Sequence, residues 1–175
     1  MTDTAYIGLG SNLGDRETYL KAGLSALNAL PQAEIKRVSS IYETAPIGYT
    51  RQPLFLNAVA AMETTIPAPS LLLKMHEIEA RHLRQRTIHW GPRTLDLDLL
   101  LYGSQQIDSP ELTLPHPHLT ERCFVLAPLC EIAPKLHHPI TDRSLQSHYQ
   151  SLDCARQLSR IDTADLGFHS CCSSI

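Results

Sequence analysis

The chain has 175 residues, of which 43% are hydrophobic and 19% charged, and a formal net charge of −3; this is enough to build one domain around its own core. Its twelve Pro and eight Gly are scattered, which excludes collagen-like and low-complexity disordered chains. No apolar run approaches the ~20 residues that span a bilayer, and the slightly acidic total argues against a general nucleic-acid binder.

The N-terminus and the cysteines indicate a cytoplasmic protein. Asp3 stands where a signal peptide would need positive charge, and no apolar segment follows it. The five Cys are odd in number and lack framework spacing, so we predict reduced thiols. Cys123, Cys130 and Cys154 are expected to lie in the core or on the surface without chemistry, and Cys171 and Cys172 to lie in an exposed tail.

Apolar periodicity predicts the elements in the first half of the chain. In order, we expect a strand over 5–10, a helix over about 15–30, a strand over 35–42, a strand over 54–62 and a helix that follows an N-cap at Ser70. The second helix would bury the stripe of Leu71, Met75 and Ile78. In the strand over 54–62, Phe55 and Asn57 would share one face, opposite an apolar one.

The second half of the chain completes an α+β pattern. A strand near 95–102 ends at Gly103, a short strand lies near 112–114, and small helices lie near Glu121 and Pro128. The order β-α-β-β-α-β predicts a ferredoxin-like antiparallel sheet with helices packed on one face. We expect one domain over 1–155 and a partly disordered C-terminal extension over 156–175, with a frayed end at 167–175.

A basic run stands next to an acidic pair. Between 80 and 95 there is no Asp or Glu, while Arg84, Arg86 and Arg93 lie in this stretch. In the strand that follows, Asp96 and Asp98 point to one face and the intervening leucines to the other, because side chains on a strand alternate. Asp is disfavoured in strands, so this pattern indicates a joint site for a divalent metal and phosphate. A solvated basic face beside a half-buried acidic strand is the alternative.

Two other motifs suggest different chemistry. Gly8, Gly10 and Gly14 approach the dinucleotide fingerprint, but the last spacing is one residue too long; we interpret them as a tight turn from strand to helix. Zinc is a further alternative, although adjacent residues rarely ligate one ion and no Cys pair has zinc-finger spacing. Its candidate ligands are His116, His118, His137 and His138.

The segment 90–100, with the sequence WGPRTLDLDLL, resembles the signature of the 6-hydroxymethyl-7,8-dihydropterin pyrophosphokinase family. The resemblance spans roughly 6–134 and includes YIGLGSNLG at 6–14, VSSIYET at 38–44, Pro46, FLNA at 55–58, LPH at 114–116 and Phe124. Several separated blocks occur in the family's order, which a chance match does not produce. The resemblance implies the same ferredoxin-like fold and the transfer of pyrophosphate from ATP to the hydroxymethyl group of the reduced pterin, releasing AMP, in folate biosynthesis.

The resemblance also implies roles for individual residues. Asp96 and Asp98 would bind two Mg²⁺ ions together with ATP, since Mg²⁺ takes one or two carboxylates plus substrate phosphates. The implied catalytic residues are Arg84 and Arg86 on a mobile basic loop, and Arg93. The implied ATP-binding residues are Arg84, Trp90, Arg93, His116 and Arg122. The implied pterin-binding residues, which include two aromatic faces and an amide, are Thr44, Ala45, Ile47, Phe55, Asn57 and Phe124.

The chain departs from the family at several positions. Pro117 stands where some members have Tyr, His76 stands where some have Gln, and the loop over 83–89 is one residue shorter than in some relatives. Glu79 matches a family acid, and we expect it to cap the helix or anchor the loop rather than to catalyse. The expected protein is a monomer whose partners are ATP and the pterin, without nucleic acid or membrane.

Two other classes of protein stay open at this point. A metal-dependent nucleotide hydrolase could use the same Asp pair and arginines, but Phe55, Asn57 and Phe124 would then have no pterin to bind. A non-catalytic ferredoxin-like binding module would have no use for an acidic pair beside clustered arginines. Replacement of Asp96 would leave the behaviour of such a module unchanged, so this substitution discriminates between an enzyme and a module.

Overall fold

The structure is a computed structural model that describes residues 1–46, 51–82, 92–154, 157–161 and 166. The basic loop over 83–91, the expected domain boundary at 155–156 and the tail over 167–175 lie outside the described residues. The same holds for four expected site residues, whose roles stay predictions: Ile47, Arg84, Arg86 and Trp90. Among the described helices, none has the length and apolar character needed to cross a membrane.

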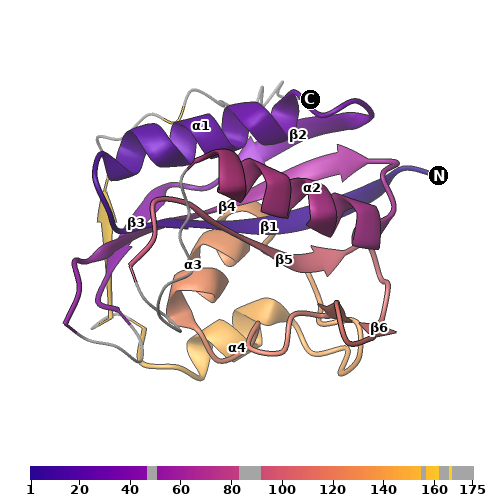
Figure 1. Cartoon of the computed structure of the whole chain (residues 1–175). Helices are drawn as coiled ribbons and strands as arrows, with labels where there is room; N and C mark the ends of the chain where they lie inside the picture. The colour runs from indigo at the N-terminus through magenta and orange to yellow at the C-terminus, as the bar shows by residue number, and fades with distance from the viewer. Residues whose placement is uncertain (47–50, 83–91, 155–156, 162–165, 167–175) are drawn as a thin grey trace, which may run out of the picture.

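An antiparallel sheet forms the middle layer of the molecule (Figure 1). In the described part of the chain, six strands belong to it in the order β5-β1-β4-β3-β8, and β2 also pairs with β4. Their bounds are β1 Asp3–Ser11, β2 Ala33–Val38, β3 Ile41–Thr44, β4 Phe55–Thr64, β5 Asp96–Tyr102 and β8 Leu158–Ile161. A separate ribbon pairs β6 Ile107–Asp108 with β7 Thr113–Leu114. Every pairing is antiparallel, as expected.

Helices cover both faces of the sheet. Helices α1 (Arg16–Asn28) and α2 (Ala68–Arg81) lie on one face, and α3 (Cys123–Ile132) and α4 (Leu145–Gln150) lie on the other (Figure 1). One buried cluster includes Leu24 and Met75 of the first pair, and a second includes Leu126 and Leu145 of the other pair. The expectation of helices on one face was wrong, because the almost wholly apolar α3 must bury its own surface against the second face.

The two long helices begin in different ways. Asp15 caps α1: its Oδ1 accepts the Thr18 N–H at 3.2 Å and its Oδ2 accepts the Thr18 hydroxyl at 2.8 Å. The expected N-cap of α2 at Ser70 is wrong, because the helix starts directly after Pro67 and Ser70 lies inside it. Pro69 fits the first turn, where a backbone N–H has no intrahelical acceptor and its absence costs nothing.

Three strand and helix boundaries differ from the sequence prediction. The strand expected over 35–42 is divided into β2 and β3 at Ser39, whose hydroxyl accepts the Val59 N–H at 2.9 Å in place of a ladder carbonyl. The small helices expected near Glu121 and Pro128 are one helix, α3, which contains Pro128. In the expected C-terminal extension, β8 adds an edge strand beside β3, and its short length gave no periodic signal.

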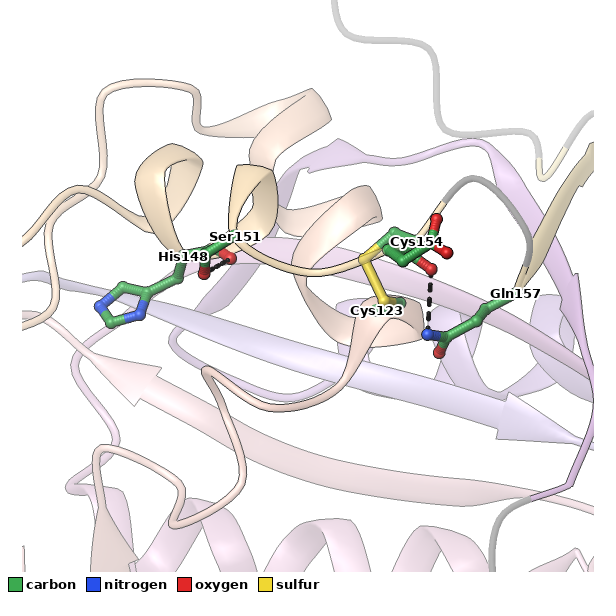
Figure 2. Close-up of a disulfide and its surroundings, with 6 residues drawn as sticks. Cys123, His148, Ser151, Cys154 and Gln157 are labelled. Atoms are coloured by element: carbon green, nitrogen blue, oxygen red, sulfur yellow. Dashed lines mark hydrogen bonds between the residues drawn. A yellow bond between two sulfur atoms is a disulfide. The ribbon is translucent and has the colours of Figure 1, made fainter.

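The expectation of reduced thiols is wrong for two cysteines. Cys123 at the start of α3 and Cys154 after α4 form a disulfide between positions 31 apart in the chain (Figure 2). Both are buried. Among the described cysteines, Cys130 of α3 is a buried free thiol, as expected. The pairing depends on the way α3 and α4 pack against each other, which cysteine spacing does not reveal.

Candidate active site

A cleft of about 470 Å³ opens on the face of the sheet that carries α3. Its floor comes from β1, β4 and β5, and its sides come from the end of β3, the segment 116–122 and the start of α3. All the expected site residues that the structure describes line this cleft: Thr44, Ala45, Phe55, Asn57, Arg93, Asp96, Asp98, His116, Arg122 and Phe124. The structure therefore brings them together, while their roles in binding and catalysis stay predictions.

Two glycines of β1 leave the floor open between the two ends of the cleft. Gly10 lies opposite Asn57 on one side and Asp96 on the other, and Gly8 lies opposite Asp98. A Cβ at Gly10 would lie 3.4 Å from Asn57 Oδ1 and 3.7 Å from Asp96 Cβ, so a side chain there would fill the space between amide and carboxylate. Gly8 and Gly10 lie in the strand expected over 5–10, and Gly14, with a φ of +64°, lies in the turn that follows it.

Asp96 and Asp98 project from β5 toward the cleft. Leu97 and Leu99 are buried in the cluster beneath α1 and α2, which confirms the expected alternation along this strand. Arg93 Nη1 lies 2.6 Å from Asp96 Oδ2, and the two side chains are only 18% and 16% exposed. This sheltered, charge-assisted hydrogen bond fixes the orientation of the Asp96 carboxylate.

The described residues contain no group of three or more His, Cys, Asp or Glu that could hold a metal by themselves. A structural zinc site takes four protein ligands. Mg²⁺ fits Asp96 and Asp98 better. It is a hard cation that accepts one or two carboxylates and completes its shell with water and phosphate oxygens.

His116 brings a neutral imidazole to the cleft. Burial, together with Arg122 and His118, lowers the pKa of His116 to about 4 against a weaker opposing effect of Asp96. His116 Nδ1 accepts the backbone N–H of His118 at 3.1 Å, which leaves the proton of the neutral ring on Nε2 as a hydrogen-bond donor. The Arg122 guanidinium lies 5.7 Å from the centroid of the Phe124 ring, a cation–π distance.

Asn57 is a buried amide at the other end of the cleft. Its Nδ2 donates to Thr44 Oγ1 at 2.9 Å, and this bond determines which way the amide faces. Its Oδ1 lies on the side of Gly10, where it can accept a hydrogen bond from a ligand N–H. Phe55 of β4 and Phe124 of α3 line the same cleft. Together these groups offer flat apolar surfaces and one oriented amide.

Asn12 connects the two ends of the cleft, and the sequence reasoning missed it. Its side chain is buried; Oδ1 accepts the Arg93 N–H at 2.8 Å, and Nδ2 donates to Gln52 Oε1 at 3.0 Å and to Pro53 O at 3.2 Å. Its backbone N–H also donates to Arg93 O at 3.0 Å. One side chain thus ties the segment that leads into β5 to the segment that leads into β4. The available signal was a polar residue in a run of turn formers, and this pattern does not predict which distant residues Asn12 bonds to.

Glu79 anchors β5 rather than capping a helix. It is 2% exposed, and its Oε1 accepts the backbone N–H of Leu97, between the two aspartates, at 2.8 Å. Because β5 is an edge strand in the described sheet, this outward N–H has no neighbouring strand to bond with, and a buried N–H without an acceptor would be costly. Glu79 therefore holds the strand that carries Asp96 and Asp98, whereas the expectation was a helix cap or an anchor of the loop over 83–89, which lies outside the described residues.

Comparisons with known proteins place these features in context. A family model described as 7,8-dihydro-6-hydroxymethylpterin-pyrophosphokinase (HPPK) matches residues 6–134. A 2-amino-4-hydroxy-6-hydroxymethyldihydropteridine pyrophosphokinase of Bacillus subtilis is 41% identical over 162 residues, which cover 93% of this chain and 96% of that protein. The protein of the same name from Pseudomonas aeruginosa is 43% identical over 139 residues, covering 79% and 86% respectively.

Solved structures add a likeness in fold. A crystal structure of Plasmodium falciparum HPPK-DHPS matches with a TM-score of 0.72 at 13% identity, over 92% of this chain and 47% of that chain. The chain therefore spans about half the length of that solved protein. At this identity the likeness supports the mixed fold with its antiparallel sheet and helices.

Proposed function

Because this chain belongs to the 7,8-dihydro-6-hydroxymethylpterin-pyrophosphokinase family, we propose that its cleft binds ATP at the Asp96 end and the reduced pterin at the Asn57 end. The chain is a pyrophosphokinase of folate biosynthesis that transfers pyrophosphate from ATP to hydroxymethyldihydropterin. The observation that carries our assignment of the site is the position of Asn57 and Asp96 on either side of Gly10, in one cleft.

The pterin end of the proposal depends on two aromatic rings and one amide. Phe55 and Phe124 would stack on the faces of the flat bicycle, and each such contact contributes about 0.5–1.5 kcal/mol beyond the burial of area. Asn57 Oδ1 would accept a hydrogen bond from a ring N–H, since its Nδ2 is already bonded to Thr44. Ala45 lines the same cleft, and the proposed contact of Ile47 rests on the family resemblance alone.

The ATP end of the proposal depends on charge. Asp96 and Asp98 would hold Mg²⁺, which when bound neutralises phosphate charge and polarises the phosphoryl oxygens. Arg93 and Arg122 would bind the triphosphate, because a guanidinium is planar, permanently charged and able to form paired hydrogen bonds. His116 Nε2–H would add a neutral donor. Roles for Arg84, Arg86 and Trp90 rest on the resemblance.

The main contribution of the protein to the reaction would be orientation. The hydroxymethyl oxygen attacks the β-phosphorus of ATP, the bond from that phosphorus to the α–β bridging oxygen breaks, and AMP leaves with the negative charge as the hydroxyl proton is released. Holding the hydroxyl in line with the phosphorus can supply ~7–11 kcal/mol. Asn12, bonded to both Arg93 and Gln52, would keep the two ends of the cleft at the required separation.

We also propose that the fold is of the ferredoxin-like type. The strand order β5-β1-β4-β3 and the position of α1 and α2 on one face support this assignment. A monomer that acts in the cytoplasm on these two small molecules stays part of the proposal, and sedimentation of the purified chain would test the monomer.

The direct test is to incubate the chain with Mg²⁺, ATP and 6-hydroxymethyl-7,8-dihydropterin and to separate the nucleotides by chromatography. We expect AMP and the pterin pyrophosphate in equal amounts, with no AMP when either the pterin or Mg²⁺ is left out. ADP as the sole nucleotide product would contradict pyrophosphoryl transfer. AMP formation without the pterin would indicate a nucleotide hydrolase instead.

A further inference from the structure

The disulfide fastens one wall of the cleft at its edge. Cys123 stands between Arg122 and Phe124, both of which line the cleft, and Cys154 follows α4. Figure 2 shows the bond joining the start of α3 to the segment after α4. Both cysteines are 3% exposed, so the bond is buried beneath the wall that it holds. It therefore restrains the backbone directly between two side chains of the candidate site.

The segment after Cys154 leads to the opposite wall. The backbone N–H of Gln157 donates to Cys154 O at 3.0 Å, and the next residue, Leu158, lies opposite Thr44 in the pairing of β8 with β3. Thr44 Oγ1 in turn accepts the hydrogen bond from Asn57. A short path of covalent and hydrogen bonds thus runs from the start of α3 to the amide at the pterin end of the cleft.

The start of α3 has no side-chain cap in the part of the chain that the structure describes. Its N-cap residue, Arg122, makes no side-chain capping hydrogen bond, although a capping side chain commonly satisfies one of the first N–H groups of a helix. The side chains of α3 in the cluster with the sheet and α4 include Val125, Leu126 and Leu129, and Phe124 is partly buried against this cluster. The disulfide thus adds a covalent restraint at the end of α3 that has no side-chain cap.

We infer that the Cys123–Cys154 disulfide is a positioning link that holds Phe124 in the wall of the cleft that Asn57 also lines, and that its reduction weakens binding of the pterin. The inference rests on the proposed function of this cleft. A dithiol supplies two electrons and two protons, the S–S bond breaks to give two thiols, and the dithiol becomes a cyclic disulfide. Disulfides in reducing compartments are commonly transient or redox-sensing, so this link would make pterin affinity depend on the thiol state of its surroundings.

Cys130 offers a matched control on the same helix. It is a buried free thiol about two turns beyond Cys123. Burial raises the pKa of the Cys130 thiol to about 11; it stays protonated near neutral pH and does not attack the disulfide, because the thiolate is the nucleophile in exchange. Cys130→Ala therefore removes a thiol from α3 without breaking the link, whereas Cys154→Ala removes the link.

The experiment uses the full chain purified without reductant. Mass spectrometry of peptides under non-reducing conditions should show those of Cys123 and Cys154 linked. Calorimetric titration of 6-hydroxymethylpterin, with Mg²⁺ and an ATP analogue that carries a methylene group between its α- and β-phosphorus, then gives the pterin Kd. We expect this Kd to rise about tenfold after treatment with dithiothreitol, because a wall that is no longer preorganised must be ordered on binding.

The variants separate positioning from general damage. Cys154→Ala should show the raised pterin Kd without reductant and no further response to it, while Cys130→Ala should match the unchanged chain in both redox states. The Kd of the ATP analogue alone should change less, since Arg122 is the one proposed ATP residue beside the disulfide, whereas Arg93, Asp96 and His116 lie on segments that the disulfide does not join. Equal loss of nucleotide and pterin binding on reduction would indicate general unfolding and would overturn the positioning role.

Three further results would also overturn the inference: unlinked peptides in the untreated chain, a pterin Kd that changes by less than about twofold on reduction, or a response of Cys154→Ala to dithiothreitol. If the ATP analogue binds but the pterin binds in neither redox state, the proposed function is contradicted. The disulfide's position is then a structural feature only.

Discussion

The two walls of the cleft are held by different forces. The sheet wall, which is the floor of the cleft, carries Asn57, Asp96 and Asp98. It is fixed by the backbone ladders of β4, β1 and β5 over a buried core. The helix wall carries Phe124 and begins at an N-cap without a side-chain hydrogen bond, next to a disulfide. A substitution on the sheet wall removes a functional group but leaves the backbone in place, whereas loss of the disulfide removes a restraint on the backbone of the helix wall. We therefore expect the first kind of change to lower turnover and the second to weaken pterin binding.

The largest expected effect belongs to the sheet wall. Asp96→Asn and Asp98→Asn should each lower kcat/KM by about a thousandfold, because an amide cannot replace the anionic ligand that we propose for Mg²⁺ near the phosphates. Steady-state AMP formation measures the loss, and circular dichroism should show an intact fold. Asp108→Asn, on an exposed position of β6, is the matched control and should keep full activity. Near-normal turnover in either cleft variant would refute the metal role.

The helix wall should show its largest effect in stability. Loss of a link between positions 31 apart should lower the free energy of unfolding by roughly 3–4 kcal/mol, because the unfolded chain regains loop entropy. Urea unfolding of Cys154→Ala and of the unchanged chain, each with and without dithiothreitol, measures this. The reductant should destabilise only the unchanged chain. Equal stability of the oxidised and reduced chains would contradict a stabilising link.

Asn12 tests whether the two ends of the cleft depend on each other. Asn12→Ala should lower kcat about tenfold through misplaced reacting groups and the free energy of unfolding by about 2 kcal/mol, because buried partners lose their hydrogen bonds. Asn28→Ala is the control, since Asn28 Oδ1 accepts the Ile35 N–H at 2.9 Å away from the cleft. It should cost some stability but no kcat. A similar loss of kcat in both variants would remove the special role of Asn12.

The smallest effect concerns pH. The folded-state pKa of His116 is about 4, below the ordinary value of 6.5, so the unfolded chain binds more protons between these two values. Stability from this group is therefore complete above about pH 6.5 and is lost progressively as the pH falls toward 4. Unfolding measured across this range should show a steeper loss for the unchanged chain than for His116→Gln. His137→Gln, outside the cleft, should keep the steep loss.

Much of the fold and of the site followed from local sequence, with identifiable exceptions. The strand with Asp96 and Asp98 alternates as expected because the period of two is carried by adjacent residues. The same reasoning failed at Ser39, where a side-chain hydrogen bond to Val59 divides an apparently continuous strand. It also failed at Ser70, because Pro69 allows the helix to start earlier than the capping residue suggested.

The sequence by itself determined the types of the long helices and strands, the face of the acidic pair and the family, since each depends on residues close together or on motifs in a set order. Only the tertiary structure decided which face α3 covers, which cysteines pair, and that Asn12 bonds to Arg93 while Glu79 bonds to Leu97. These partners lie between 18 and 81 positions apart. Burial selects them, because a polar group removed from water must bond with whatever the fold places beside it.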